Sequence, residues 1–247
     1  MAHFRDDPRF SALGLAPAHP VAPLPAKGTA LGTIAATYNR IGGLSDALAA
    51  AATIDPMAVL AVWIVESGSY PFVPGKPVLR FENHQFWKYW GQKNAAVFDR
   101  HFQFGGHPNP GKSWQHHMFR NPVTGPWRPF HGDQALEYEV FDWATHLSDL
   151  DTACLSCSFG GPQIMGFNHD ALGYDDARSL FTAFGQDLRW QVLGFFDFVK
   201  SKGLLRDIRD QVWNDFGTAY NGDGAVYGPK IKALFDLKAK FAALPRA

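Results

Sequence analysis

The sequence predicts a mainly helical protein with at most a small β element, and three observations support that fold class. Apolar residues recur at helical spacing over most of the chain after residue 30. A helix start signal, Asp55-Pro56, stands directly before the clearest of these apolar stripes. A strand-like pattern is limited to one short stretch, residues 78–81. With 247 residues, of which 46% are hydrophobic, the chain is long enough for one large domain or two small ones.

The first 30 residues differ from the rest of the chain. Residues 16–25 contain four prolines, and proline cannot continue a helix because it lacks the amide hydrogen and fixes its own φ. We therefore predict a Pro/Ala-rich arm or linker over residues 1–30, followed by a single domain over residues 31–247. The alternative for residues 1–30 is a strap that packs on this domain.

Residues 31–52 predict two short helices. Apolar residues lie at helical spacing over residues 31–41, and Gly42 and Gly43 then interrupt the pattern because glycine is a poor helix former. A second helix is expected to begin after Ser45, whose hydroxyl can cap it.

The segment 70–132 is the least regular part of the chain and is rich in Pro, Gly, His and aromatic residues. We interpret residues 85–131 as an irregular, aromatic-rich insert. Helical pattern returns with Asp133 as the expected N-cap. Gly203 has the place of a left-handed residue after a helix end. The further helices are expected at about 176–188, 190–202, 205–217 and 227–242.

Charge and composition exclude several classes of protein. Lys plus Arg equals Asp plus Glu, 23 against 23, so no overall basic field favours nucleic acid or anionic lipid as a partner. No stretch approaches the roughly 20 apolar residues that span a bilayer, so we expect no membrane insertion. The N-terminus is charged and lacks an apolar core segment. We therefore expect no signal peptide, and synthesis in the cytoplasm.

Neither the cysteines nor the histidines predict a metal or redox site. Cys154 and Cys157 form Cys-x-x-Cys, but a thioredoxin-type site needs a βαβ setting and a structural zinc needs two more ligands. We expect two buried thiols. The insert holds five of the ten histidines, at irregular spacing and without a His-Glu-x-x-His helix. They are His101, His107, His116, His117 and His131. The sequence therefore predicts no metal and no cofactor.

Glu66 is the first candidate for chemistry, because it stands at the C-terminal end of the apolar helix that Asp55-Pro56 begins. A carboxyl in this place is partly desolvated and faces the negative end of the helix dipole, and both effects raise its pKa. A carboxylic acid that is still protonated near neutral pH can donate a proton to a leaving oxygen. The alternative is a surface glutamate at a frayed helix end.

Two further motifs have a composition that suits ligand contact. Residues 158–166 (SFGGPQIMG) place two glycines and a proline in an apolar run, which predicts a tight turn where backbone approaches a ligand. Gln163 can both donate to and accept from sugar hydroxyls and N-acetyl groups. Residues 219–224 (AYNGDG) lie between two expected helices. The alternatives are a plain helix connection for the first motif and an ordinary Asn-Gly turn for the second.

Taken in order, the three motifs resemble the lysozyme-like superfamily, with its goose-type lysozymes and soluble lytic transglycosylases. More narrowly, residues 61–68 (AVWIVESG), 78–84 (VLRFENH) and 158–173 are similar to the N-acetylmuramidase family of phage endolysins and bacterial wall-degrading toxins. The resemblance covers about residues 31–242, and residues 163–169 (QIMGFNH) are its most specific part. It implies that the domain over residues 31–247 is lysozyme-like.

The resemblance also implies roles for individual residues. Glu66 matches the catalytic glutamate, a general acid, and Glu82 matches a family glutamate that is our candidate for a second carboxylate. The family usually carries a basic residue where this chain has Asn83, so the charge around Glu82 is expected to differ. The expected substrate-binding residues are Ser67, His84, Ser158, Gln163, Met165, His169, Tyr220 and Asn221.

The expected function is hydrolysis of the β-1,4 bond between N-acetylmuramic acid and N-acetylglucosamine, with no cofactor and with peptidoglycan glycan strands as the partner. One alternative is a lytic transglycosylase, which forms 1,6-anhydro ends. Another is a peptidoglycan-binding module without turnover. Without a signal peptide, the protein is expected to reach the periplasm or cell wall by lysis or through a secretion system. A secreted toxin would imply a cognate immunity protein, and an endolysin would not.

Overall fold

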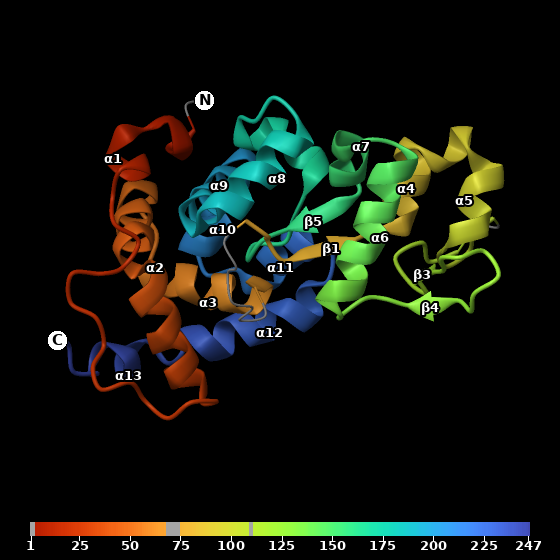
Figure 1. The fold of residues 1–247 in the computed structure, drawn as a ribbon. Coiled ribbons are helices and arrows are strands. Elements are labelled where there is room, and N and C mark those ends of the chain that lie inside the picture. Colours follow the sequence, from red (N-terminus) through yellow and green to blue (C-terminus); the bar gives the residue numbers. More distant parts are fainter. Residues whose placement is uncertain (1–2, 68–74, 109–110) are drawn as a thin grey trace. The chain divides into compact units, whose positions relative to one another are not determined.

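The computed structural model describes residues 3–67, 75–108 and 111–247 and is mainly helical, as the sequence predicts (Figure 1). The chain forms two compact units. Unit one combines Met1–Pro71 with Asp187–Ala247, and unit two is Phe72–Gln186. Unit two is therefore inserted, in sequence, between the two segments of unit one.

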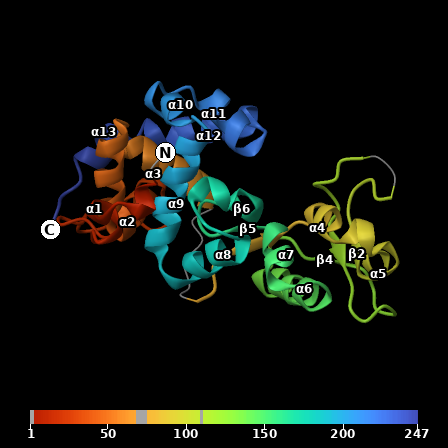
Figure 2. The same ribbon diagram turned by 90° about the horizontal axis from the view of Figure 1, so that it is seen from above.

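In the described residues, unit one is built from helices. These are η1 (Phe4–Asp6), α1 (Pro8–Ser11), α2 (Ala30–Ala52), α3 (Pro56–Ser67), α9 (Leu188–Ser201), α10 (Leu205–Arg209), α11 (Trp213–Asn221), α12 (Gly224–Phe235) and α13 (Lys238–Ala242). The helix α3 is surrounded by α2, α10 and α12, and α11 lies against α12 (Figures 1 and 2).

The helix α3 forms the core of unit one. It begins where the sequence predicts, at Pro56, and the Asp55 carboxylate accepts a hydrogen bond from the amide of Met57 at 2.9 Å. Nearly every side chain of α3 is buried, on all sides of the helix. A helix that is apolar all round is expected at the centre of a core, and this placement carries Glu66 into the interior.

The prediction of two helices over residues 31–52 is wrong, because α2 runs unbroken through Gly42 and Gly43. Both glycines lie where a side chain would collide with a neighbour. A Cβ on Gly43 would overlap the carbonyl of Ala16, and one on Gly42 would overlap the Tyr38 ring. Gly43 therefore admits the N-terminal segment to the helix surface, and Gly42 leaves room for the Tyr38 ring of the same helix. Neither glycine ends the helix.

Replacing Gly43 with Ala is expected to destabilise unit one, although the same change in a helix interior ordinarily stabilises by about 0.5–1 kcal/mol. The new methyl group displaces the segment around Ala16, and such overpacking costs about 1–3 kcal/mol. The free energy of unfolding, measured in urea, checks this sign. Arg40→Ala, at an exposed position of the same helix, is the control and is expected to change little. A more stable Gly43→Ala variant would contradict this packing.

The described part of the N-terminal segment packs as a strap on unit one. The buried Asp197 carboxylate of α9 accepts hydrogen bonds from the amides of Phe4 at 2.6 Å and Arg5 at 3.2 Å. Further along the strap, Val21 is buried and pairs with Arg246 in an isolated antiparallel bridge. The strap is thus held to α9 and to the C-terminal end of the chain.

The C-terminal helices differ from the prediction in one place that concerns the site. A single helix was expected over residues 205–217, but α10 ends at Arg209 and α11 begins at Trp213. Between them Gln211 has a φ of 57°, a left-handed conformation that breaks a helix. The helix expected over 227–242 is likewise divided into α12 and α13. Gly203 is left-handed with a φ of 73°, as predicted.

Unit two combines helices with two three-stranded antiparallel sheets in its described residues. Its helices are α4 (Asn83–Tyr89), η2 (Gly91–Lys93), α5 (Ala95–His101), α6 (Gln134–Leu147), α7 (Leu150–Leu155), η3 (Gly166–Asn168), η4 (Asp170–Leu172) and α8 (Ala177–Gln186). Its strands are β1 (Leu79–Phe81), β2 (Phe102–Gln103), β3 (Met118–Phe119), β4 (Arg128–Pro129), β5 (Cys157–Phe159) and β6 (Ile164–Met165). The sheet orders are β1-β5-β6 and β2-β3-β4.

The strand expected over 78–81 is β1, and Asp133 caps α6 as predicted, through Oδ1 to the amides of Ala135 and Leu136 at 2.9 and 3.2 Å. Within unit two, β1 packs against α6, and α7 lies beside α6 (Figure 2). The sheet β1-β5-β6 thereby places residues 79–81 beside residues 157–165. Nearly all of these residues belong to two of the segments that resemble the N-acetylmuramidase family.

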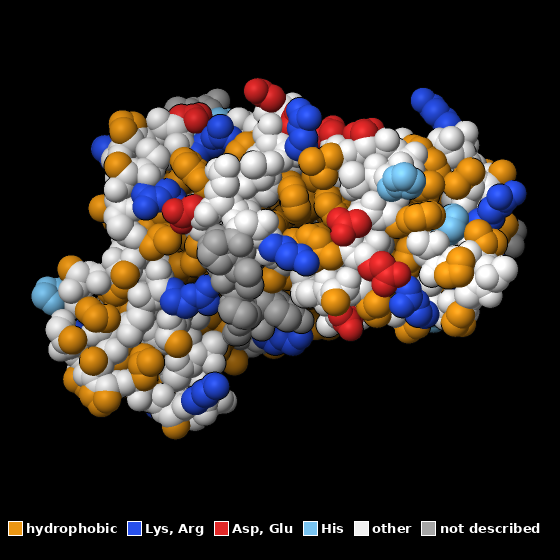
Figure 3. All heavy atoms as spheres, viewed as in Figure 1, with side chains coloured by type: hydrophobic (Ala, Val, Ile, Leu, Met, Phe, Trp, Pro, Cys, Tyr) orange, Lys and Arg blue, Asp and Glu red, His pale blue; other side chains and the backbone are white. Residues whose placement is uncertain are grey.

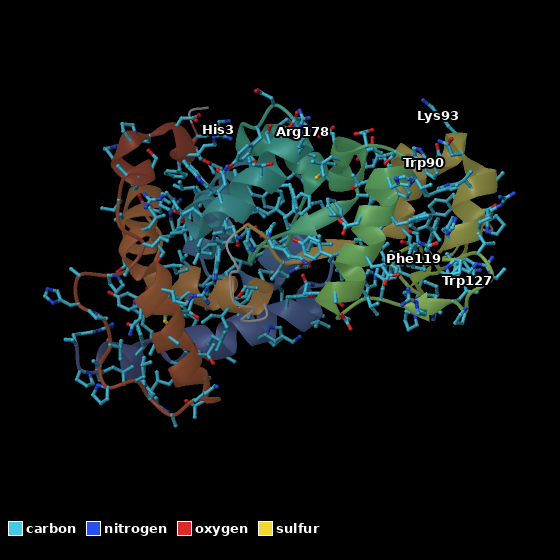
Figure 4. The ribbon with its side chains drawn as sticks, in the orientation of Figure 1. His3, Trp90, Lys93, Phe119, Trp127 and Arg178 are labelled. Carbon is cyan, nitrogen blue, oxygen red and sulfur yellow. The ribbon has the colours of Figure 1, made fainter. Side chains whose placement is uncertain are left out.

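The insert has an aromatic core of its own. Phe102 is fully buried and lies 5.1 Å from Phe98, 5.2 Å from Phe86 and 5.5 Å from Phe119 between ring centroids. Figure 4 labels Phe119, the last residue of β3, and Trp127, which directly precedes β4. The insert is therefore a packed part of unit two and not an extended loop.

No single helix of the described residues is long and apolar enough to cross a membrane. The pair α2 and α3 reaches that length and composition only together, across a bend of 119°. On the face drawn in Figure 3, Lys and Arg side chains are interspersed with Asp and Glu. This mixture agrees with the equal numbers of the two charge types in the sequence.

Candidate active site

Glu66 is the penultimate residue of α3 and is buried, with 9% of its surface exposed. The residue that follows it, Ser67, is buried as well. The interpretation of Glu66 as a frayed surface residue is therefore wrong. A carboxyl group in the interior needs polar partners, and unit one supplies them from α11 and α12.

The Asn221 side chain is the main partner of Glu66. Its amide nitrogen lies 2.6 Å from both carboxylate oxygens of Glu66 and donates to them. Asn221 was expected in a loop, but it ends the last turn of α11, and Gly222 follows with a left-handed φ of 82°. This helix end aims the amide at the carboxyl group, which a mobile Asn-Gly turn would not do.

Burial raises the pKa of Glu66 to about 7. The hydrogen bond from Asn221 and the positive charge of Lys230 on α12 both lower it, so desolvation outweighs them. At this pKa a large share of Glu66 is protonated near neutral pH. The side chain can then donate a proton to a bound oxygen, and its partners stabilise the carboxylate that remains.

Tyr220 lies beside this carboxyl group. Burial of the phenol and the charge of Glu66 hold the pKa of Tyr220 well above its usual value. The ring stacks on Phe216 at 5.3 Å and meets the edge of Phe198 at 5.4 Å between centroids. Tyr220 is therefore a neutral, rigidly packed phenol. Unit one thus brings together four predicted site residues: Glu66, Ser67, Tyr220 and Asn221.

A second group of predicted residues lies on the β5–β6 hairpin of unit two. The hairpin replaces the helix connection that was the alternative for residues 158–166. Ser158 and Met165 are paired across the two strands. Gln163 stands in the turn with a left-handed φ of 50°, a conformation that is uncommon for a residue with a side chain.

Hydrogen bonds fix the Gln163 side chain in this turn. Its carbonyl oxygen accepts from the Ser158 hydroxyl at 3.0 Å, and its amide donates to the carbonyl of Gly160 at 2.7 Å. Nearby, the His169 ring lies 2.9 Å from the carbonyl of Tyr174 through Nδ1. Ser158, Gln163 and Met165 therefore form one rigid surface, while His169 is held by a separate turn.

Glu82 follows β1 and precedes α4, and it is buried among basic groups. The Arg80 guanidinium donates to Oε1 at 2.8 Å, and Nδ1 of His84 and Nδ1 of His117 lie 3.4 and 3.5 Å from Oε2. Although burial opposes ionisation, these neighbours lower the pKa of Glu82 to about 2. Burial also lowers the pKa of His117, to about 4. Glu82 is therefore an anion beside a neutral His117 at neutral pH.

Three residues near these groups were not predicted. Lys230 tunes Glu66 from α12, and His117 and His131 lie beside Glu82. No spacing rule connects residues so far apart in the sequence, and only the β2-β3-β4 sheet brings the two histidines to Glu82. The two cysteines are free and buried, as expected, and burial raises the pKa of each.

Comparison with known proteins places the chain in a family. The family model described as N-acetylmuramidase matches residues 55–236. Among solved structures, the crystal structure of the Burkholderia AP3 phage endolysin matches with a TM-score of 0.61 and 27% sequence identity, over 81% of this chain and 70% of that chain. The comparison with curated proteins finds no match. Because the family model spans well over half of the sequence, the chain belongs to the N-acetylmuramidase family and is a glycoside hydrolase whose substrate is peptidoglycan.

Proposed function

We propose that the protein hydrolyses the β-1,4 bond between N-acetylmuramic acid and N-acetylglucosamine, with Glu66 as the general acid. One observation carries this proposal. Glu66 is buried, has a pKa of about 7 and is held by the Asn221 amide. Such a group is available as a proton donor near neutral pH, as the first step of glycoside hydrolysis requires.

In the proposed reaction, protonated Glu66 gives its proton to the glycosidic oxygen while the bond to the anomeric carbon breaks. Positive charge develops on the sugar ring, and water supplies the hydroxyl group that completes hydrolysis. The remaining proton of this water is released to solvent, and Glu66 regains a proton from solvent before the next turnover. The Asn221 amide and the Lys230 charge stabilise the Glu66 carboxylate that the transfer leaves behind. These contacts stabilise the ionised form of Glu66, which is the form that the proton transfer produces.

Glu82 stays a candidate for the second carboxylate on the ground of the resemblance alone. A carboxylate with a pKa of about 2 is a weak base and takes a proton from water poorly. The proposal therefore depends on Glu66. Ser67, His84, Ser158, Gln163, Met165, His169, Tyr220 and Asn221 stay proposed contacts of the glycan, with Gln163 presented by the fixed turn described above.

Analysis of the products tests this proposal. Purified sacculi digested with the protein are expected to release muropeptides that end in reducing N-acetylmuramic acid, which mass spectrometry identifies by the mass gained on borohydride reduction. Ends with 1,6-anhydro-N-acetylmuramic acid would instead show a lytic transglycosylase. Reducing N-acetylglucosamine ends would show cleavage of the other glycosidic bond. Binding to sacculi with no released muropeptide would show a binding module.

We also propose that the protein reaches the wall as endolysins do, through a membrane pore during lysis of the cell that made it. The similarity to a phage endolysin supports this route. Delivery as a secreted toxin is the alternative, and it would require an immunity protein. A gene for a membrane pore beside this one would favour the first route, and a gene for a small inhibitor would favour the second.

A further inference from the structure

A cluster of buried acceptor atoms lies at one end of β1 in unit two. Glu82 directly follows this strand, His117 directly precedes β3, and His131 follows β4. One side-chain atom from each of these three residues lies within 4.8 Å of the other two. His84, in the first turn of α4, borders the cluster with Nδ1 at 3.4 Å from Oε2 of Glu82.

Hydrogen bonds fix which nitrogen of each histidine carries the hydrogen. Nε2 of His117 lies 2.9 Å from the carbonyl of Ser113, which can only accept, so Nδ1 holds the lone pair. Nδ1 of His131 lies 3.0 Å from the buried Glu137 carboxylate, so Nε2 holds the lone pair. Both rings thus present an acceptor and not a donor to the cluster.

Two of the atoms that face each other are acceptors that lack donors. Arg80 donates to Oε1 of Glu82, but Oε2 is buried with no hydrogen-bond partner, and so is Nε2 of His131. The exception is Nδ1 of His117, which accepts a hydrogen bond from the amide of Asn83 at 3.2 Å. Buried polar atoms without partners are costly. A cation bound between the carboxylate oxygen and the imidazole nitrogens would give these acceptors a partner.

The donor set favours one class of cation. Two imidazole nitrogens and one carboxylate oxygen are ligands of Zn²⁺ and related first-row ions, whereas Ca²⁺ and Mg²⁺ prefer oxygen alone. Ligands bonded at about 2.0–2.1 Å to a tetrahedral Zn²⁺ are about 3.3 Å apart. Oε2 of Glu82 is already 3.5 Å from Nδ1 of His117 and 3.4 Å from Nδ1 of His84.

The outer contacts have the arrangement that supports metal-bound histidines. A ligand histidine usually donates its other N–H to a carboxylate or a backbone carbonyl, which fixes the ring and its tautomer. The carboxylate of Glu137 does this for His131, and the carbonyl of Ser113 does it for His117. The Glu137 carboxylate is itself held by the amide of Phe81 at 2.8 Å.

We propose that Glu82, His117 and His131 bind a structural Zn²⁺ ion. The ion would join the two ends of the β3–β4 hairpin to the end of β1, and so fasten the insert to the rest of unit two. The site lies within unit two and does not depend on the proposed role of Glu66. In this proposal Glu82 serves as a metal ligand and not as the second catalytic carboxylate.

Metal binding by the full-length protein tests the proposal directly. The protein is stripped with a chelator, dialysed and titrated with ZnCl₂ alone or CoCl₂ alone. We expect one equivalent of Zn²⁺ per chain, with a Kd below about 1 μM, and a higher Tm in its presence. Co²⁺ is expected to give the intense visible absorption of a tetrahedral site, which Zn²⁺ then displaces.

Three variants distinguish Zn²⁺ binding at this site from nonspecific binding at the protein surface. His131→Gln removes a ligand and is expected to weaken Zn²⁺ binding more than 100-fold. Glu137→Gln leaves the three ligands in place, changes the contact behind His131 and is expected to weaken Zn²⁺ binding about 10- to 100-fold. His101→Gln is the matched control, because His101 is a buried histidine of the same insert whose ring contacts the carbonyl of Arg120. Its affinity for Zn²⁺ is expected to match the wild type.

Several results would overturn the proposal. They are uptake of less than one equivalent by the stripped wild type, octahedral Co²⁺ spectra, and equal loss of affinity in His101→Gln and His131→Gln. An affinity that survives in His131→Gln would place the ion elsewhere. Should His131→Gln fail to fold, the stoichiometry and the Co²⁺ spectrum of the wild type still decide. A histidine of the cluster that NMR shows to be protonated at pH 7 in the presence of Zn²⁺ would show that a proton fills the role of the cation.

Discussion

Replacing Glu66 with Gln is expected to reduce the release of muropeptides from sacculi about 10³-fold, since general acid catalysis contributes about 10²–10⁴-fold to such reactions. The amide has the size of the carboxyl group and can still accept a hydrogen bond from Asn221, but it has no acidic proton to give. The fold and the binding of sacculi are expected to persist. Initial rates of release, compared at equal protein concentration with circular dichroism as a check of folding, measure the effect.

The matched control is Glu139→Gln on α6. Glu139 is a partly exposed carboxylate paired with Arg128 at 2.6 Å, and loss of an exposed pair changes little. Its activity is expected to stay within about twofold of the wild type. Should Glu66→Gln retain a tenth or more of the wild-type rate, Glu66 would not be the general acid and the proposed reaction would be wrong.

The same substitution is expected to make stability less dependent on pH. The pKa of Glu66 is about 7 in the folded protein against an ordinary value of 4.5. Between these values the folded state holds more protons than the unfolded state, so the free energy of unfolding falls as the pH rises. The stabilisation is complete below pH 4.5 and is lost as the pH passes 7. The loss is at most about 3 kcal/mol by the relation between pKa shift and free energy.

The difference in free energy of unfolding between Glu66→Gln and the wild type isolates this effect. We expect urea unfolding to show that, from pH 5 to pH 8, the free energy of unfolding of the variant rises by about 2 kcal/mol relative to that of the wild type. His117 titrates equally in both proteins, so its contribution cancels. If the free energies of unfolding of the variant and the wild type differ by the same amount at pH 5 and pH 8, burial does not hold a proton on Glu66. In Glu139→Gln the corresponding difference is expected to be small.

What the sequence reveals about this protein is mostly local. Asp55-Pro56 identifies the start of α3 because an N-cap and a proline act within one helical turn, and Asp133 and Gly203 act over similar distances. The acid at the end of α3 follows from the same pattern. The family resemblance, which depends on the order of three motifs, agrees with the family model.

The features that the sequence does not reveal depend on contacts between distant segments. From the sequence alone, the pair of glycines in α2 indicates a helix break. The structure gives another reason for Gly43, because the strap around Ala16 packs against it. Likewise, Asn221 belongs to a turn by its Asn-Gly sequence, and its place in α11 follows from packing against α12. His117 and His131 lack a regular spacing from Glu82, so their convergence is a property of the small sheet of the insert.

The division of unit one into two segments of the chain has a consequence for how the protein is made. Glu66 and Asn221 are 155 positions apart, and all of unit two is synthesised between them. A ribosome therefore produces the acid long before the amide that holds it. Contacts of such long range form late in folding, so the proposed catalytic group is assembled only once translation is nearly complete. Incomplete chains are therefore expected to have no activity on the glycan.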